Sequence, residues 1–347
     1  MTDRSAHKRL LADLIADVAT CAPEDLVRVL LAGSHEDAVW EVFHPFNTLY
    51  GVLEAVEAFW GPLKRSFPDF EVRQHFSIAG EFGGGEWVST LGHVMGSFEV
   101  PWIGIPATHQ VCYLRLGINA LVKDGRIARA HVYLDVIDVM RQAGCYPFRE
   151  MPGSPEQWPA PPASSGADLF GYDPELGART LTTTQEMQAS LPPPAKDLAE
   201  HRAQIRHSPH WHPNMNWYGP AGIGSCRGMR QFRQYHVRLF LQAFPDRTGG
   251  STPWPASTPG HYVQAGDGHF SVTGGWPSLR GTHTGGGWLG LAPTGRTVDM
   301  RVADWYRTDR HHLLVDNWVM IDIPHVLLQL GQDVLDDMRY LVDRTTP

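Results

Sequence analysis

Two stretches of the chain decide how it folds: GVLEAVEAFWGPLKRSFPD at residues 51–69 and GMRQFRQYHVRLFLQAFPD at residues 228–246. Both begin with glycine and end with Phe-Pro-Asp at the same spacing. In each stretch apolar residues recur every three or four positions, which is the spacing of a buried helix face. Proline then ends the helix. The chain therefore carries the same helical element twice.

Two further pairs of segments follow in the same order. WIGIPATHQ at 102–110 matches WLGLAPTGR at 288–296, and HVYLDVIDVMRQAG at 131–144 matches WVMIDIPHVLLQLG at 318–331. In the last pair Asp135 aligns with Asp322. Blocks that recur in one order at similar separations predict an internal duplication.

Each half contains helices first and then strands. Alternating runs such as VCYLRLGINALV at 111–122 and VDMRVADWYR at 298–307 are typical of half-buried strands. Helices before a run of strands indicate an α+β fold. A length of 347 residues fits two domains. We expect domains at residues 1–148 and 201–347, joined by a proline-rich linker at 149–200 that ends in a helix from Lys196.

The composition limits the partners. Hydrophobic residues make up 42% of the chain and charged residues 19%, as in a globular protein. The net charge of −8 argues against nucleic acid or an anionic membrane as a partner. No apolar run approaches the ~20 residues of a membrane span. The four cysteines form no CxxC pair, so we expect reduced thiols and a cytoplasmic protein. The partner that we expect is a small molecule.

The ordered segments AFPD, WLGLAPTGR and WVMIDIPHVLLQLG closely resemble the SnoaL-like polyketide cyclase family of the nuclear transport factor two-like superfamily. The resemblance covers residues 20–148 and again 205–340, and it is closer in the second half. The first half departs from it, for example in having His131 where the second has Trp318. The resemblance implies two tandem cone-shaped α+β barrels, each a curved antiparallel sheet wrapped around helices and a deep pocket.

The family also implies a chemistry. Its best-known members close rings by aldol chemistry without metal or cofactor, using an Asp near the C-terminal strand as acid and base. By position that residue is Asp322, with Asp135 as its counterpart in the first half. The superfamily also contains dehydratases, isomerases, epoxide hydrolases and non-catalytic binders, so the fold does not decide the reaction.

Side chains alternate between the two faces of the strand before each Asp. We expect the polar and aromatic face to line a pocket; its members are Asp316, Trp318, Met320 and Asp322 in the second half and His131, Tyr133 and Asp135 in the first. The other face is apolar and suits packing against another sheet. The two halves would then pack as a pseudo-dimer, and a further homodimer is conceivable.

The two Asp residues have two open interpretations. In an apolar, Trp-lined cavity the pKa of a carboxyl rises toward the working pH, which suits Asp322 beside Trp318 and Met320 as a general base. Asp135 has two potential donors nearby in His131 and Tyr133. Alternatively, each Asp caps the helix-like run that follows it.

Histidines supply weaker candidates. His212 and Tyr218 open the second half, where the family places residues at the pocket mouth, so we expect substrate contacts there. His283 on a probable strand is a candidate donor. The segment HSPHWHP contains His207 and His210 at spacings that metals use, but no convergent partner is identifiable, so no metal is expected.

These features favour a cofactor-independent enzyme that acts on a small, largely apolar, carbonyl-bearing compound by cyclisation, isomerisation or lyase chemistry. One alternative is a non-catalytic binding or scaffold protein that uses the same pockets. Another is a hydrolase that activates water within an Asp–Arg–Asp cluster, for which Asp316, Asp322 and Arg301 are the obvious members.

Overall fold

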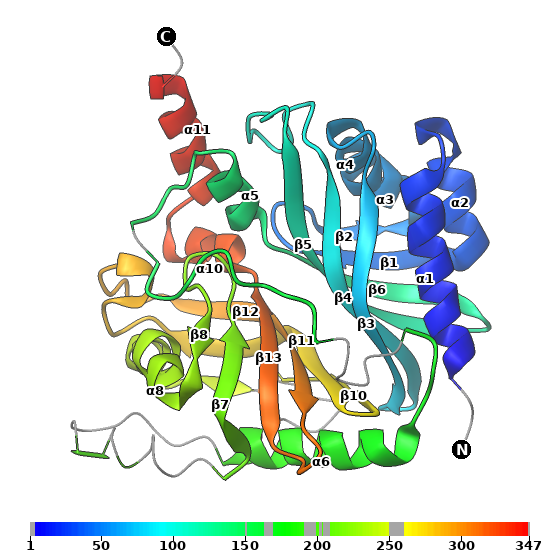
Figure 1. The fold of residues 1–347 in the computed structure, drawn as a ribbon. Helices are drawn as coiled ribbons and strands as arrows, with labels where there is room; N and C mark the ends of the chain where they lie inside the picture. The colour runs from blue at the N-terminus through cyan, green and yellow to red at the C-terminus, as the bar shows by residue number, and fades with distance from the viewer. Residues whose placement is uncertain are drawn as a thin grey trace. The chain divides into compact units, whose positions relative to one another are not determined.

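The computed structural model describes residues 4–149, 151–162, 169–190, 199–200, 203, 209–249 and 260–345. The chain divides into two compact units (Figure 1). Unit 1 comprises Met1–Pro147, Ala167–Tyr172 and Asp333–Pro347, and unit 2 comprises Phe148–Gly166 and Asp173–Gln332. Among the described helices, none combines the length and apolar character needed to span a membrane.

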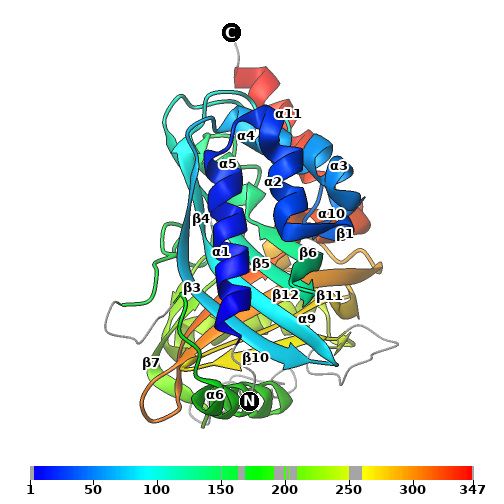
Figure 2. The ribbon, with the colours of Figure 1, turned by 90° about the vertical axis from the view of Figure 1, so that its right-hand side faces the viewer.

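The helices of unit 1 include the stretch predicted at 51–69. This stretch is one helical run with a π-helical turn in its middle: α3 (Gly51–Ala55), η2 (Val56–Trp60) and α4 (Gly61–Ser66). The other helical segments are α1 (Ser5–Thr20), η1 (Pro23–Asp25), α2 (Leu26–Gly33), α5 (Val136–Gln142) and α11 (Val334–Thr345). Figure 2 shows α1 beside α2, and α1 also packs against β3 (Glu71–Phe82).

The sheet of unit 1 has the strand order β2-β1-β6-β5-β4-β3. The other strands are β1 (Ser34–Val42), β2 (Asn47–Tyr50), β4 (Gly85–Ser97), β5 (Val111–Lys123) and β6 (Arg126–Leu134). All neighbours are antiparallel except β1 and β6, which are parallel. The antiparallel sheet that was expected is therefore present with one parallel pair, which arises because the helical run after β2 carries the chain across to β3 at the opposite edge.

The elements of unit 2 follow a similar order. Its helical segments are α6 (Pro174–Ala189), α8 (Gly228–Phe232), the π-helical η4 (Arg233–Val237), α9 (Arg238–Ala243), η5 (Trp288–Gly290) and α10 (Ile323–Leu330). Its strands are β7 (Trp211–Tyr218), β8 (Cys226–Arg227), β9 (Thr248–Gly249), β10 (Val263–Asp267), β11 (Phe270–Thr282), β12 (Thr297–Thr308) and β13 (Leu314–Ile321). The order is β10-β11-β12-β13-β7-β8, with β9 beside β11 and only β13 and β7 parallel. Both units therefore have the expected α+β architecture of a sheet with helices on one face.

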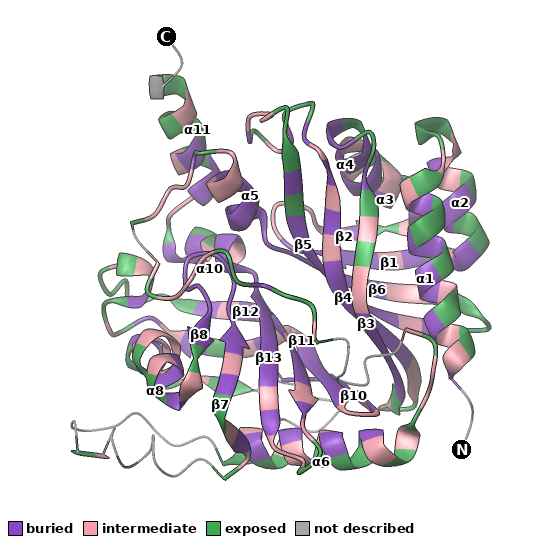
Figure 3. Cartoon of the chain, viewed as in Figure 1, coloured by how far each residue is buried: buried purple, intermediate pink, exposed green. Residues whose placement is uncertain are grey.

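Each sheet has an inner face, which we define as the face that contacts the π-helical segment. In unit 1 Trp40 of β1 packs on Trp60 of η2, and Ala130 of β6 lies opposite Trp40. His131 and Tyr133 therefore project to the other, outer face. The expected pocket-lining face is thus the one turned away from the helices. Figure 3 shows that buried positions dominate the strands of both sheets.

The predicted linker contains part of unit 2. Within residues 149–200, α6 packs against β10 and β11, and Ser154 forms a β-bridge with Ser225. A Cβ placed on Gly177 of α6 would lie 2.3 Å from the carbonyl oxygen of Gly266, so the helix and β10 meet backbone to backbone. The domain boundaries therefore differ from those expected. The helix predicted from Lys196 falls mostly outside the described residues.

Candidate active site

The inner face of the unit 2 sheet carries polar residues among aromatic ones. Trp217 of β7 packs against His236 of η4, with ring centroids 4.2 Å apart, so its side chain defines the inner face. Asn317 of β13 lies opposite Trp217, and Tyr306 of β12 lies opposite Asn317. Asp304 is two residues before Tyr306 and therefore shares this face.

Asp304 is the carboxyl group at the centre of this set. It accepts hydrogen bonds from the Asn317 amide, at 3.5 Å, and from the side chain of Tyr306. Burial raises the pKa of Asp304 to about 7, and the two hydrogen bonds oppose this rise only in part. The residue as a whole is nevertheless of intermediate exposure. At neutral pH this carboxyl is divided between its acid and base forms.

Helix α6 adds Gln188 to the same site. Its amide nitrogen donates to the Tyr306 hydroxyl at 3.3 Å and to the Thr273 hydroxyl at 2.9 Å. It also lies 3.4 Å from Nδ1 of His261. Burial and the charge of Asp304 raise the pKa of Tyr306, so its hydroxyl stays protonated and can donate. The predicted linker therefore supplies a residue of the site.

His236 forms the helical side of the site. Its ring is stacked nearly parallel on Trp217, at an interplanar angle of 17°. Burial lowers the pKa of His236 to about 3, so the imidazole is neutral. Its buried Nδ1 has no hydrogen-bond partner among the residues that the structure describes. π-Helical turns such as η4 occur often at functional sites.

Unit 1 has apolar residues at the matching positions. The backbone N–H of Asp135 donates to the Arg115 carbonyl, and that of Asp322 donates to the Arg301 carbonyl, which aligns the two sheets. Counting from these anchors, the residues of unit 1 that match Asp304, Tyr306 and Asn317 are Ile118, Ala120 and Ala130. All three are at most 1% exposed. Only the inner face of unit 2 therefore offers acid/base groups at these positions.

Asp135 and Asp322 have both carboxylate oxygens engaged. In Asp322, Oδ1 accepts from the backbone N–H of His325 at 3.2 Å and Oδ2 from Nη1 of Arg301 at 3.1 Å. Asp135 repeats the pattern with Asp138 and Arg115, at 3.1 and 2.9 Å. Each Asp is the N-cap of the helix that follows. The geometry thus favours the capping alternative over the general base for both.

Asp316, Trp318, Met320 and Tyr218 lie together on the outer face of unit 2. Nε1 of Trp318 donates to the Pro159 carbonyl at 2.9 Å, and its ring stacks on Tyr218. The Tyr218 hydroxyl donates to Asp316, whose other oxygen is paired with Arg307. Trp318 and Met320 are fully buried. These predicted contact residues therefore lie on the face of the sheet opposite to that of Asp304, and Tyr218 joins Asp316 and Trp318 there.

The Asp–Arg–Asp cluster required for the hydrolase alternative does not form. Asp322 pairs with Arg301, whereas Asp316 pairs with Arg307. The two Asp residues are six positions apart on an extended segment, which separates them by about 20 Å. One arginine cannot bridge that distance, so this interpretation was wrong.

His131 belongs to a buried chain of polar contacts on the outer face of unit 1. Its Nε2 lies 2.8 Å from Oε2 of Glu41, and its Nδ1 lies 3.4 Å from the Tyr133 hydroxyl. Burial would raise the pKa of Glu41, but the contacts with His131 and Arg129 outweigh it and lower that pKa. His131 and Tyr133 are thus close together, as expected, but on the face away from the helices.

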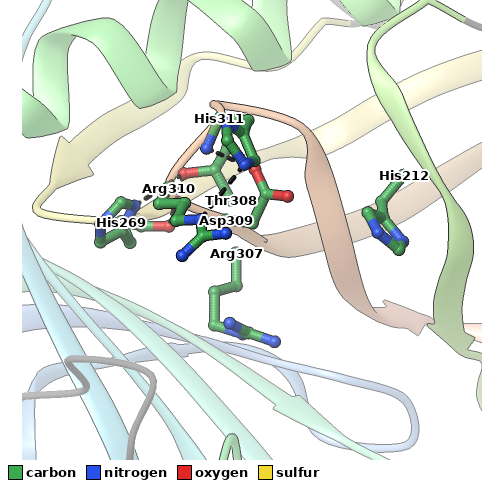
Figure 4. Close-up of a pocket in the computed structure, with 7 residues that line it drawn as sticks. All are labelled: His212, His269, Arg307, Thr308, Asp309, Arg310 and His311. Carbon is green, nitrogen blue, oxygen red and sulfur yellow. Dashed lines mark hydrogen bonds between the residues drawn. The ribbon is translucent and has the colours of Figure 1, made fainter.

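His212 lines a surface pocket of about 480 Å³ in unit 2 (Figure 4). The other lining residues are His269, Arg307, Thr308, Asp309, Arg310 and His311. In this pocket Arg307 is already paired with Asp316, and Oδ1 of Asp309 accepts two backbone N–H groups of its own turn. The charged groups of the pocket are therefore largely satisfied within the protein.

The remaining histidines are dispersed. His283, one residue beyond β11, is fully buried with Nδ1 3.4 Å from the Thr294 hydroxyl, and burial lowers its pKa. His283 therefore does not face solvent. His210 lies 3.9 Å from Glu186, and His207 falls outside the described residues. The described part of the chain contains no group of three potential metal ligands.

Sequence reasoning missed Asp304 as a candidate base, although it lies in the quoted strand VDMRVADWYR. The signal was present in the comparison of the two halves. At the alternate positions 304 and 306 the second half has Asp and Tyr, where the first has Ile118 and Ala120. A polar pair that replaces an apolar pair on one strand face marks a changed interior.

No family model and no curated protein matches the chain. Solved structures do match it. A protein from Jannaschia sp. CCS1, provisionally named a SnoaL-like polyketide cyclase, is 17% identical, with 40% of this chain and 90% of that one covered at a TM-score of 0.34. A provisionally named polyketide cyclase from Xanthomonas campestris is 19% identical, with 41% and 99% covered and a TM-score of 0.34.

A third match has a ketosteroid isomerase-like fold. This protein from Catenulispora acidiphila, solved with trimethylamine, is 15% identical, with 39% of this chain and 92% of that one covered at a TM-score of 0.29. Two of these three matched structures therefore carry the provisional name of a polyketide cyclase. The side chains of unit 2, and not these matched structures, are the basis for inferring a reaction.

Proposed function

We propose that unit 2 is an acid/base catalyst, independent of a cofactor, in which Asp304 removes a proton from a small, apolar carbonyl compound. The observation that carries this proposal is the place of Asp304 on the inner face of the sheet, where Tyr306 and the Asn317 amide bond to its carboxyl and burial raises its pKa to about 7. A general base works best when its pKa lies near the operating pH, and such a base typically contributes ~10²–10⁴-fold in rate. Ring closure, isomerisation and elimination from a carbonyl compound all begin with this step.

The developing enolate oxygen needs a hydrogen-bond donor. His236 is neutral and has an unpartnered Nδ1 within the described chain. It stacks on Trp217, two strands from Asp304, which is a separation of roughly 10 Å. A conjugated substrate along the inner face would place its acidic C–H at Asp304 and the remote carbonyl oxygen that receives the electron pair toward His236.

The proton balance is then simple. Asp304 takes the proton from carbon and the electron pair moves onto the carbonyl oxygen. In an isomerisation the same carboxyl returns the proton to another carbon. In a ring closure the carbanion attacks a second carbonyl, and the resulting alkoxide takes the proton from Asp304. Neither route needs a group beyond the carboxyl and a donor.

The rings beside the site favour an apolar, planar substrate. Trp217 contacts Phe232 as well as His236, and Trp211 contacts Tyr306. Aromatic side chains bind flat molecules by offset stacking. We further infer that the two units are tandem copies, of which the second retains a catalytic interior. A sheet-to-sheet pseudo-dimer, a homodimer and a cytoplasmic location stay predictions.

Hydrogen exchange in D₂O tests this proposal before the product is known. A panel of small ketones and β-dicarbonyl compounds is incubated with the protein, and loss of the α-proton signals is followed by NMR. We expect exchange that depends on the protein and is absent with Asp304→Asn. Exchange that persists unchanged in Asp304→Asn would rule out Asp304 as the base.

The second candidate is a ligand-binding protein that uses the same inner face. The Asn317 amide favours it, because this amide also bonds to the backbone carbonyls of Trp305 and Trp318 and is therefore held by the protein. Saturation-transfer NMR on the same panel separates the two candidates. Binding without α-proton exchange supports the binder, whereas binding with exchange supports the enzyme.

A further inference from the structure

Helix α6 contacts the inner face of the unit 2 sheet through polar side chains. Its residues Thr180, Thr184 and Gln188 are four positions apart and lie on one helix face. Their hydrogen-bond partners on the sheet are the hydroxyls of Thr308, Ser271 and Thr273, at 3.3, 2.8 and 2.9 Å respectively. In unit 1 the buried face of α1 consists largely of Leu11, Leu14, Ile15 and Val18. Polar side chains that face a buried sheet cost stability unless they are hydrogen-bonded, and all three are.

The position of α6 along the sheet is fixed by glycine. A Cβ on Gly266 of β10 would lie 2.1 Å from the carbonyl oxygen of Gly177, and a Cβ on Gly177 would be equally close to Gly266. Real Cβ atoms do not approach backbone this closely, so both positions must remain glycine for the helix to sit here. The contact therefore sets where Gln188, three turns further along the helix, meets the sheet.

Gln188 determines how the Tyr306 hydroxyl can bond. The Gln188 amide nitrogen carries only donors, so at 3.3 Å from the Tyr306 oxygen it must be the donor and that oxygen the acceptor. Thr273 is a second hydrogen-bond partner of this hydroxyl and, like Gln188, lowers the pKa of Tyr306. The hydroxyl proton of Tyr306 then points elsewhere, and its partner is the carboxyl of Asp304 on the same strand face. The second N–H of Gln188 is held by Thr273, which fixes the amide plane.

We propose that Gln188 is a positioning residue for Asp304, acting through Tyr306 by fixing that hydroxyl as a donor to the carboxylate. This inference rests on the proposed function of Asp304. The donor chain runs from the Gln188 amide to the Tyr306 hydroxyl and on to the Asp304 oxygen. It favours the anionic form of Asp304, which is the form that accepts a proton from substrate.

The titration of Asp304 reports directly on this series of hydrogen bonds. Burial, the Asn317 amide and the Tyr306 hydroxyl are the groups that shift its pKa, and no charged side chain of the described residues contributes. Losing the Tyr306 donation therefore removes one of two contacts that hold the pKa down. A variant that frees the Tyr306 hydroxyl should shift the Asp304 titration upward from about 7.

The experiment follows the Asp304 carboxyl by ¹³C NMR in full-length protein labelled at aspartate carboxyl carbons, with Asp304→Asn identifying the resonance. We expect Gln188→Leu and the milder Gln188→Asn to raise the titration midpoint. Tyr306→Phe should raise it as well, and adding Gln188→Leu to Tyr306→Phe should cause no further rise. Gln185→Leu is the matched control, because Gln185 lies on the same helix but bonds to Gln264.

Two results would overturn the role of Gln188. One is an unchanged midpoint in both Gln188 variants while they remain folded. The other is a Gln188→Leu shift of the same size with and without the Tyr306 hydroxyl. Failure of the proposed function looks different, because wild-type Asp304 would then titrate as an ordinary carboxyl whatever residue stands at 188. If Gln185→Leu shifted the Asp304 titration midpoint as much as Gln188→Leu does, both shifts would be explained by a general loosening of α6. That result would contradict the proposal.

Discussion

The inner faces of the two sheets differ at three matching positions. Unit 1 has Ile118, Ala120 and Ala130, and unit 2 has Asp304, Tyr306 and Asn317. The apolar set contributes to a buried core, whereas a buried carboxyl costs stability unless it is paired. This difference supports the proposal that unit 2 is the working half.

The features that both units share are structural. Gln142 bonds to the backbone N–H and C=O of Tyr113, and Gln329 does the same with Asp299. The capping Asp–Arg pairs also occur in both. Contacts present in both units maintain the fold, and the residues that differ on the inner face are the ones to test for function.

The largest expected effect is on turnover. Asp304→Asn should lower the rate of the proton-transfer step by ~10²–10⁴-fold, because the amide cannot accept the substrate proton. Asp135→Asn in unit 1 should have a rate within a few-fold of wild type with the same substrate, when the rate is calculated for the folded fraction of the variant. Equal losses in the two variants would contradict a division of labour between the units.

The next effect is on folding. Ile118→Asp places a carboxyl at the position of Asp304 in unit 1, where Ala120 and Ala130 offer no side-chain donor. We expect a loss of about 2–5 kcal/mol in the free energy of unfolding, measured by urea denaturation at pH 8. Ile118→Val is the control, at about 1 kcal/mol. A small loss in Ile118→Asp would mean that unit 1 already tolerates a polar interior.

Asp322→Asn separates the two interpretations of the shared aspartates. It weakens a helix cap and leaves Arg301 without its anionic partner, so the free energy of unfolding should fall by about 1–3 kcal/mol. Turnover should persist at temperatures where the variant stays folded. The opposite pattern, lost turnover at unchanged stability, would restore Asp322 as the base.

A further effect is a gain in stability of Asp304→Asn over wild type that depends on pH. The pKa of Asp304 is about 7 in the folded protein and 3.8 for a free aspartate. Between these values the unfolded chain is ionised while the folded one holds a proton, so wild-type stability falls as pH rises. Asp304→Asn removes this loss. Its advantage in unfolding free energy over wild type should grow from pH 4 to pH 8, by on the order of 3–4 kcal/mol. A pH-independent difference would mean that Asp304 titrates normally.

Much of the architecture could be predicted from the sequence. The spacing of Gly51–Asp69 and Gly228–Asp246 gave the two helical runs, and the alternation in 111–122 and 298–307 gave strands in both units. The caps at Asp135 and Asp322 were one of two open interpretations. These features depend on local periodicity and on nearby donors, which a single sequence contains.

The site could not be placed in the same way. Alternation separates the faces of a strand but does not say which face meets the helices when both are buried, as Ala130 and Tyr133 both are. The linker assignment failed because α6 presents Thr180, Thr184 and Gln188 to the sheet and so lacks an apolar stripe. The parallel pairing of β1 with β6 depends on contacts between distant parts of the chain.

The most direct test of the account is the titration of Asp304 itself. Aspartate carboxyl carbons are labelled in wild type and in Asp304→Asn, and ¹³C chemical shifts are followed from pH 3 to pH 9. We expect a wild-type resonance with a midpoint near 7 that is missing from the variant spectrum. If the resonance missing from Asp304→Asn instead titrates near pH 4 in wild type, unit 2 lacks the base on which its proposed chemistry depends.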